Sequence, residues 1–413
     1  MDLLRFITAG SVDDGKSTLI GRLLYDSKNI LSDQLETLKK QSKSTSYTDI
    51  DLALITDGLR AEREQGITID VAYKYFSTPK RKFIIADAPG HIQYTRNMIT
   101  GASNSDCIII LIDARNGVIE QTRRHSIIAS LLKIPHVIVA INKMDIVGYE
   151  EEVYNKIVED YTNVAAELEL NDVYYIPISA LKGDNIIQSS SNLTWFNGEP
   201  LLAYLENVEI KKINIQAPSR FAVQYVIRPQ TQEAHDYRGY AGKISSGIYR
   251  KGEAVTILPS GLTSAIKAIE LDRKEVHEAF AGQSVVLHLE DDIDVTRGDA
   301  IVKINELPRL QNEFDVLMCW MDNHQLSSGK KYILQHGTRR IKAIVKAIDY
   351  KLDVNTLVRE SQPAAVGLND VVKATIKTAE PLAFDPYQTL PTNGTAILID
   401  QTSHMTVGAC LIQ

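Results

Sequence analysis

The first residues that could do chemistry form a glycine-bounded loop close to the N-terminus. Gly10 opens the loop and Gly15 closes it, between the apolar run Leu3–Ala9 and leucines at helical spacing. In a strand, loop and helix of this kind, backbone N–H groups and the positive end of the helix dipole face a polyphosphate. Lys16 would reach the β- and γ-phosphates, and the Ser17 hydroxyl would bind Mg²⁺. The residues expected at the nucleotide are Gly10, Ser11, Val12, Asp13, Asp14, Gly15, Lys16, Ser17 and Thr18.

A second group of polar residues follows the apolar run at residues 137–142. A carboxylate at Asp145 can accept hydrogen bonds from the ring N–H and the amino group of guanine, and adenine offers neither. Because an unpaired buried acceptor loses its solvation, such sites discriminate by roughly 10⁴ to 10⁵. Asn142 would tie neighbouring loops together at the purine edge, and the Lys143 stem would cover the base. The expected guanine site comprises Asn142, Lys143, Met144, Asp145, Ser179, Ala180 and Leu181, with backbone N–H groups of Ser179 and Ala180 at the guanine oxygen.

A third group follows the short apolar run Lys82–Asp87 and carries the candidate catalytic residue. Phosphoryl transfer depends on positioning an in-line water and on stabilising charge. Asp87 would hold Mg²⁺ through water, Thr68 would add a second hydroxyl, and His91 would orient the attacking water. The Gly90 N–H would sense the γ-phosphate, so its loss would release both segments as a switch. This group comprises Asp87, Ala88, Pro89, Gly90 and His91, and the metal set is Ser17, Thr68 and Asp87.

Apolar runs that alternate with helical patterns position these groups. Further strands are expected at residues 69–76, Cys107–Asp113 and 173–178, and a closing helix at 200–208. The alternation predicts an α/β P-loop domain over residues 1–209, with a mostly parallel sheet and helices on both faces. The segment 26–65 has two helical patterns, and it is either a helical insert or a partner-docking element.

The sequence changes character beyond residue 217. Short β-rich runs with Gly- and Ser-containing turns about every ten residues predict two all-β barrels, over residues 218–307 and 308–413.

Composition narrows the classes of partner. The chain has 413 residues and a formal net charge of -7, so we expect no nucleic acid partner. The three cysteines, Cys107, Cys319 and Cys410, have no metal-ligand spacing, and a reducing cytoplasm is the simple expectation. No apolar run approaches the ~18 residues of a membrane span, so we expect no membrane association.

With these motifs assembled, the chain resembles the translation-factor class of GTPases, which are similar to elongation factor Tu. Within that class it looks like the GTP-binding large subunits of bacterial two-subunit sulfate adenylyltransferases. The motifs that carry the resemblance are the loop 10–18 and the segments 61–72, 93–98, 121–125 and 142–145. Asp14 and Ser17 stand where elongation factors usually carry His and Thr, and they point to the sulfate branch.

The resemblance implies further roles. Val12 and Ile67 would form an apolar gate around the catalytic His91, with GTP and Mg²⁺ as the cofactors. A separate, smaller adenylyl-transferring subunit would join ATP and sulfate to give adenosine 5′-phosphosulfate and pyrophosphate, and GTP hydrolysis would drive that uphill step. Ile92 stands where family members commonly have Glu, which could alter the coupling.

Two other functions remain open at this point. One is an elongation-factor-like carrier that binds aminoacyl-tRNA across its barrels, and the other is a regulatory GTPase with an unrelated partner. Asp14 and the long insert favour the sulfate branch over the carrier.

Overall fold

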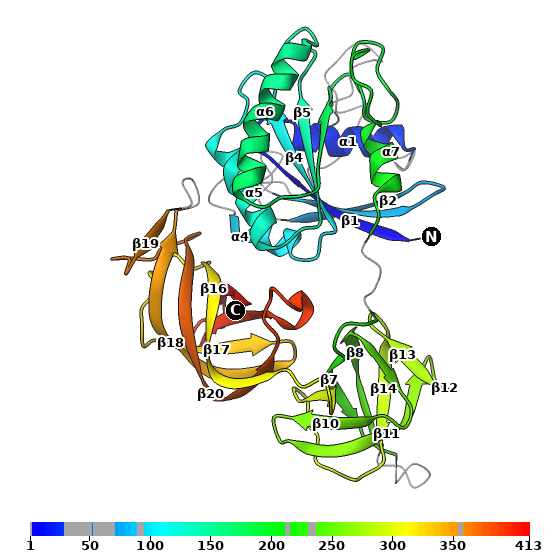
Figure 1. The fold of residues 1–413 in the computed structure, drawn as a ribbon, viewed down its shortest axis with the longest axis vertical. Helices are drawn as coiled ribbons and strands as arrows, with labels where there is room; N and C mark the ends of the chain where they lie inside the picture. The colour runs from blue at the N-terminus through cyan, green and yellow to red at the C-terminus, as the bar shows by residue number, and fades with distance from the viewer. Residues whose placement is uncertain are drawn as a thin grey trace. The chain divides into compact units, whose positions relative to one another are not determined.

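The computed structural model describes residues 2–28, 52, 71–88, 95–210, 215–229, 237–353 and 358–413. Contacts group the chain into two compact units, Met1–Ile210 and Lys211–Gln413. Figure 1 shows helices around a sheet in the first unit and β-barrels in the second. The predicted fold class is therefore confirmed. The limits 1–209, 218–307 and 308–413 stay predictions, as do the helices expected within 26–65, most of which lies outside the described residues.

The first unit is built on a six-stranded sheet with the order β2-β3-β1-β4-β5-β6. Only β2 runs antiparallel to its neighbour. Since β4 is buried along its whole length, its sequence is apolar on both faces, as parallel strands covered by helices require. The strands are β1 (Leu3–Ala9), β2 (Ala72–Ser77), β3 (Lys82–Asp87), β4 (Cys107–Asp113), β5 (His136–Asn142) and β6 (Val173–Pro177).

Helices cover both faces of this sheet because successive strand residues point to opposite sides. Leu4 and Phe6 of β1 pack with α1 (Lys16–Asp26) and α7 (Leu201–Asn207). Ile7 and Ala9 pack with α4 (Thr95–Ala102), α5 (Glu120–Leu131) and α6 (Glu151–Glu167) on the other face. Figure 1 shows these helices beside the sheet. Within the described ranges, no helix is both long and apolar enough to cross a membrane.

This topology positions the candidate site. β1, β3, β4, β5 and β6 are parallel, so their carboxyl ends meet at one edge of the sheet. Ligands bind outside that edge in open α/β sheets. Asp87, Asp113 and Asn142 are each the last residue of their strand, and the phosphate-binding loop starts where β1 ends.

The second unit begins with a closed antiparallel barrel. Its strands follow the order β10-β15-β7-β8-β14-β11, and a pairing of β10 with β11 closes the ring. β12 (Lys274–Val276) extends one edge, and β9 (Ile248–Arg250) pairs separately with β13 (Glu278–Phe280). The barrel strands are β7 (Arg220–Ile227), β8 (Gly239–Ser246), β10 (Ala254–Leu258), β11 (Leu262–Leu271), β14 (Ser284–Leu289) and β15 (Ala300–Lys303).

A second antiparallel barrel follows, with the order β17-β21-β22-β16-β20-β18 and closure through β17 and β18. β19 (Arg359–Ser361) extends its edge, and a 3₁₀ turn (Pro391–Asn393) precedes β21. The strands are β16 (Arg309–Trp320), β17 (Lys331–His336), β18 (Arg339–Leu352), β20 (Val371–Phe384), β21 (Thr395–Asp400) and β22 (Thr406–Ile412).

A buried ion pair joins the two barrels. The Arg220 guanidinium of β7 donates to both carboxylate oxygens of Asp385, at 2.7 and 2.9 Å, and to the Glu306 carbonyl at 2.6 Å. Asn393 donates a further hydrogen bond to Asp385 at 2.7 Å. The Arg220 and Asp385 side chains are only 5% and 11% exposed. Each charge therefore depends on the other for its compensation.

Asp385→Ala leaves the Arg220 guanidinium buried without its carboxylate, and we expect a loss of about 3–5 kcal/mol in unfolding free energy. Urea unfolding followed by Trp320 fluorescence, in a Trp195→Phe background, measures it. Asp292→Ala in the same background is the control, since Asp292 pairs with Arg238 but is 84% exposed, and it should lose less than about 1 kcal/mol. Equal losses in the two variants would contradict the role given to the buried pair.

Candidate nucleotide-binding site

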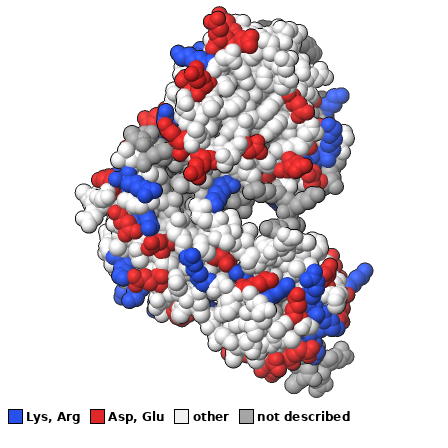
Figure 2. Space-filling view, in the orientation of Figure 1, with Lys and Arg blue, Asp and Glu red and all other residues white. Residues whose placement is uncertain are grey.

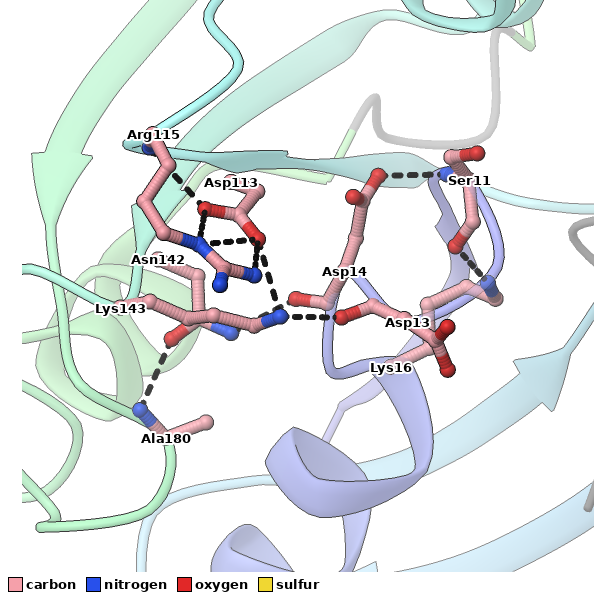
Figure 3. A network of polar contacts seen from close by, with 9 residues as sticks. All are labelled: Ser11, Asp13, Asp14, Lys16, Asp113, Arg115, Asn142, Lys143 and Ala180. Atoms are coloured by element: carbon pink, nitrogen blue, oxygen red, sulfur yellow. Dashed lines mark hydrogen bonds and ion pairs between the residues drawn. The ribbon is translucent and has the colours of Figure 1, made fainter. Parts of the chain in front are cut away.

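The loop between β1 and α1 folds around its own lysine. The Lys16 Nζ donates to the Gly10 carbonyl at 3.0 Å, and the side chain is buried. It also donates to the Ser11 carbonyl at 2.7 Å (Figure 3). Burial lowers the pKa of the ammonium, while the nearby carboxylates of Asp87 and Asp14 act against that shift. An ammonium held in this way, at the start of a helix, is poised for an anion.

Gly15 lets this loop approach β5 closely. Its φ of +94° lies in the left-handed region, and it is the residue directly before α1. A Cβ at this position would lie 2.5 Å from the Asn142 Nδ2 atom. Only glycine satisfies both conditions without displacing the amide.

Asp14 braces the same loop from inside. Its buried carboxylate accepts a hydrogen bond from the Ser11 N–H at 2.5 Å. Burial raises the pKa of this carboxyl, and the Ser11 hydrogen bond opposes that rise. Asp14, which stands where elongation factors usually carry His, therefore supports the backbone of the loop.

The Asn142 side chain connects three loops. Its Nδ2 donates to the Asp14 carbonyl at 2.7 Å, and its Oδ1 accepts from the Ala180 N–H at 2.9 Å (Figure 3). Because the amide is 2% exposed, both ends need these partners. The phosphate loop, the end of β5 and the loop after β6 are thereby fixed to one another.

Lys143 lies across the phosphate loop. Its Nζ donates to the Asp13 carbonyl at 2.5 Å and lies 2.9 Å from an Asp113 carboxylate oxygen. The backbone at Lys143 has a φ of +65°, which is uncommon for a residue with a side chain. Asp145, two residues on, is half-buried.

Most of the other predicted base-side residues are buried around this point. Met144, Ser179 and Ala180 are at most 1% exposed, whereas Leu181 is 61% exposed. The structure thus brings the predicted base-side group and the phosphate loop together.

Asp87 lies at the end of β3, 2% exposed, and accepts a hydrogen bond from the Thr8 hydroxyl at 3.3 Å. Asp87 pairs in the sheet with Thr8, two residues before Gly10, so it lies close to the start of the phosphate loop. Ser17 is in the first turn of α1, Ala88 is buried, and Val12 is 39% exposed. Carboxylate and hydroxyl oxygens suit Mg²⁺. Thr18 lies in the first turn of α1 beside Ser17. The residues that lie outside the described part of the chain are Ile67, Thr68, Pro89, Gly90, His91 and Ile92.

Sequence reasoning missed Asp113 and Arg115. Asp113 ends β4 as Asp87 ends β3 and Asn142 ends β5, and this shared position is the signal that could have found it. The Arg115 guanidinium donates to both Asp113 oxygens, the shortest distance being 2.6 Å. Burial would raise the pKa of Asp113, but hydrogen bonds from Arg115 and Lys143 outweigh it and hold that pKa well below its usual range.

Two family models match the chain. The elongation factor Tu GTP binding domain matches residues 1–217, and the GTP-eEF1A C-terminal domain-like family matches residues 313–413. Together with the sheet and its phosphate loop, these matches define a GTP-binding P-loop protein of the translation-factor class.

Curated relatives match the whole chain. A bifunctional enzyme CysN/CysC of Mycobacterium tuberculosis (strain ATCC 25618 / H37Rv) is 51% identical over 411 residues, which are 99% of this chain and 67% of the relative. Sulfate adenylyltransferase subunit 1 of Alteromonas mediterranea is 51% identical over 413 residues, which are 100% of this chain and 87% of the relative. The chain belongs to the family of sulfate adenylyltransferase subunit 1 proteins. A crystal structure of sup35 complexed with GMPPNP also matches, covering 100% of this chain and 93% of its own, with 24% identity and a TM-score of 0.45.

Gly15→Ala should destabilise the first unit more than Gly148→Ala. Both glycines have positive φ, +94° and +66°, so both variants carry the left-handed penalty of roughly 1–2 kcal/mol. Only the Cβ at residue 15 meets the Asn142 amide, since nothing lies within 4 Å of one at residue 148. We expect a further loss of about 1–3 kcal/mol from the displaced amide. Urea unfolding by Trp195 fluorescence in a Trp320→Phe background measures it, and equal losses would contradict the close approach.

Proposed function

We propose that this chain is the GTP-hydrolysing subunit of a two-subunit sulfate adenylyltransferase. In this proposal a separate, smaller subunit joins ATP and sulfate, and GTP hydrolysis drives that uphill step. The observation that carries the GTPase part is the meeting of three groups at one sheet edge: the phosphate loop, Asp87 and the Asn142–Asp145 segment. The proposed role in sulfate activation rests on family membership and on relatives named sulfate adenylyltransferase subunit 1 that match this whole chain.

Guanine would be selected at the end of β5. The Asp145 carboxylate accepts hydrogen bonds from the ring N–H and amino group of the base, and adenine would leave that acceptor unpaired. The Lys143 stem covers the base, because its ammonium is held over the phosphate loop. The Ala180 N–H donates to Asn142 and the Ser179 N–H donates to the Asp184 carbonyl, so the contacts expected of these two groups at the guanine oxygen would require them to leave those partners.

The triphosphate would bind at the start of α1. Lys16 extends to the β- and γ-phosphates from its carbonyl partners, and loop N–H groups face the same oxygens. Mg²⁺, held by Ser17, Thr68 and, through water, Asp87, would neutralise charge on the β- and γ-oxygens. His91 would orient the water for in-line attack, with Val12 and Ile67 as an apolar gate around it.

Loss of the γ-phosphate would release the segments that contain Thr68 and Gly90, and this release is the proposed signal to the rest of the protein. The smaller adenylyl-transferring subunit is proposed to receive this signal.

A cytoplasmic location accompanies the proposal, because Cys107, Cys319 and Cys410 are buried free thiols that suit a reducing compartment.

The carrier alternative shares the two barrels with this proposal. A carrier of aminoacyl-tRNA must bind a phosphate backbone, which favours gathered positive charge. The chain has a net charge of -7, and on the face drawn in Figure 2 Lys and Arg are interspersed with Asp and Glu. These charges, together with the full-length relatives, favour the sulfate proposal.

Co-expression with a candidate small subunit tests the proposal. We expect pyrophosphate release from ATP and sulfate to rise when GTP is added, and to stay at its GTP-free level with Lys16→Ala, whose phosphate loop lacks the ammonium. A coupled pyrophosphate assay on the purified complex measures both. Retention of tRNA without any GTP stimulation would favour the carrier instead.

Asp145→Asn should move nucleotide preference from GTP toward xanthosine triphosphate, because the amide donates where the carboxylate accepted. Loss of a hydrogen-bonded charge predicts GTP binding about 10²-fold weaker. Competition against a fluorescent guanine nucleotide measures the ratio, with the exposed neighbour Glu150→Gln as control. If Asp145→Asn retains its GTP preference, Asp145 is not the base-reading residue.

A further inference from the structure

A buried carboxylate with two cationic partners lies beside the phosphate loop. Asp113 ends β4, and its side chain is 2% exposed. Arg115 turns back on it from two residues along the chain, and the Arg115 backbone N–H also donates to Asp113 at 3.0 Å. On its other side Asp113 meets the Lys143 ammonium at 2.9 Å (Figure 3).

Lys143 is consequently anchored at two points, one in the phosphate loop and one at the end of β4. The Asp13 carbonyl lies on the phosphate loop, and the Asp113 carboxylate lies at the end of β4. An ammonium on a four-carbon stem is otherwise free to rotate. These two anchors fix its end, so they also fix the path of the methylene stem between β5 and the phosphate loop.

We propose that Asp113 and Arg115 form a clamp that positions Lys143 for the guanine base and thereby sets how long the nucleotide stays bound. This inference rests on the proposed GTP-binding function. Asp113 and Arg115 are positioning residues, since they act through Lys143. Removing the Asp113 charge leaves the ammonium with the Asp13 carbonyl as its anchor, and the stem can swing away from the base.

The electrostatics favour the clamp over a surface ion pair. Because the Asp113 carboxylate is buried, its attraction for Lys143 is screened less than that of exposed charges. The Arg115 fork occupies both carboxylate oxygens and fixes their orientation. Arg115 itself is 47% exposed, so it can be replaced without opening the core.

The chain offers a matched control at the other end of the same strand. Asp106 directly precedes β4, and its carboxylate accepts a hydrogen bond from the Arg5 N–H at 2.9 Å. It therefore lies at the amino edge of the sheet, opposite the nucleotide site. A change of charge there tests for a general effect on this strand.

The experiment measures the dissociation rate of a fluorescent methylanthraniloyl-GDP from the full chain by stopped flow. Asp113→Asn keeps the shape and removes the charge, and we expect dissociation about 10-fold faster, which corresponds to about 1.4 kcal/mol. Arg115→Ala should speed it about 3-fold, and this exposed position guards against a failure of the first variant to fold. Asp106→Asn should match the wild type.

A double-mutant cycle separates positioning from a structural role. Lys143→Met keeps the stem and removes the ammonium, so Asp113→Asn should add less than about 2-fold in that background. Full multiplication of the two effects, or wild-type rates in both Asp113→Asn and Arg115→Ala, would overturn the clamp while leaving GTP binding intact. A wild-type chain that binds no guanine nucleotide would instead overturn the proposed function.

Discussion

One buried side-chain amide holds the candidate site together. Asn142 donates to the phosphate loop and accepts from the loop after β6, and it is 2% exposed. Breaking either hydrogen bond would strand a buried polar atom, which costs about 1–3 kcal/mol. Moving one of these loops independently of the other therefore requires breaking one of the two hydrogen bonds. This arrangement requires glycine at position 15, because any side chain there would displace the Asn142 amide.

The parallel sheet explains why polar residues gather at that amide. Strands covered on both faces are mostly apolar along their length, so a polar residue that follows a long apolar run often marks the strand end. Three parallel strands of the sheet, β3, β4 and β5, end in Asp87, Asp113 and Asn142, and all three end at the same edge. The fold thus gathers polar side chains at one edge of the sheet.

The same physics decides what could be predicted. The apolar runs of β1, β3 and β4 predict those strands to the residue, because burial fixes both of their ends. β20 extends to Phe384, although its apolar run stops near residue 376, because pairing with β16 and β18 maintains exposed polar residues in the strand. The Asn142 tie was predictable from its motif. The contact between Asp113 and Lys143 could not be predicted in this way. It joins the ends of two strands, and an Asp and a Lys far apart in the sequence would be expected to be exposed to solvent.

The Lys143 side chain is held in place by groups of the protein itself. Immobilising a long side chain on binding costs about 0.5–1.5 kcal/mol. Here the ammonium is held by Asp13 and Asp113 of the protein itself, so that ordering is completed during folding rather than when the base arrives. Arg115 and Lys143 keep the Asp113 carboxyl charged by holding its pKa well below the usual range. The Asp113 anchor of Lys143 should therefore remain charged as the pH falls into the range in which an ordinary aspartate is protonated.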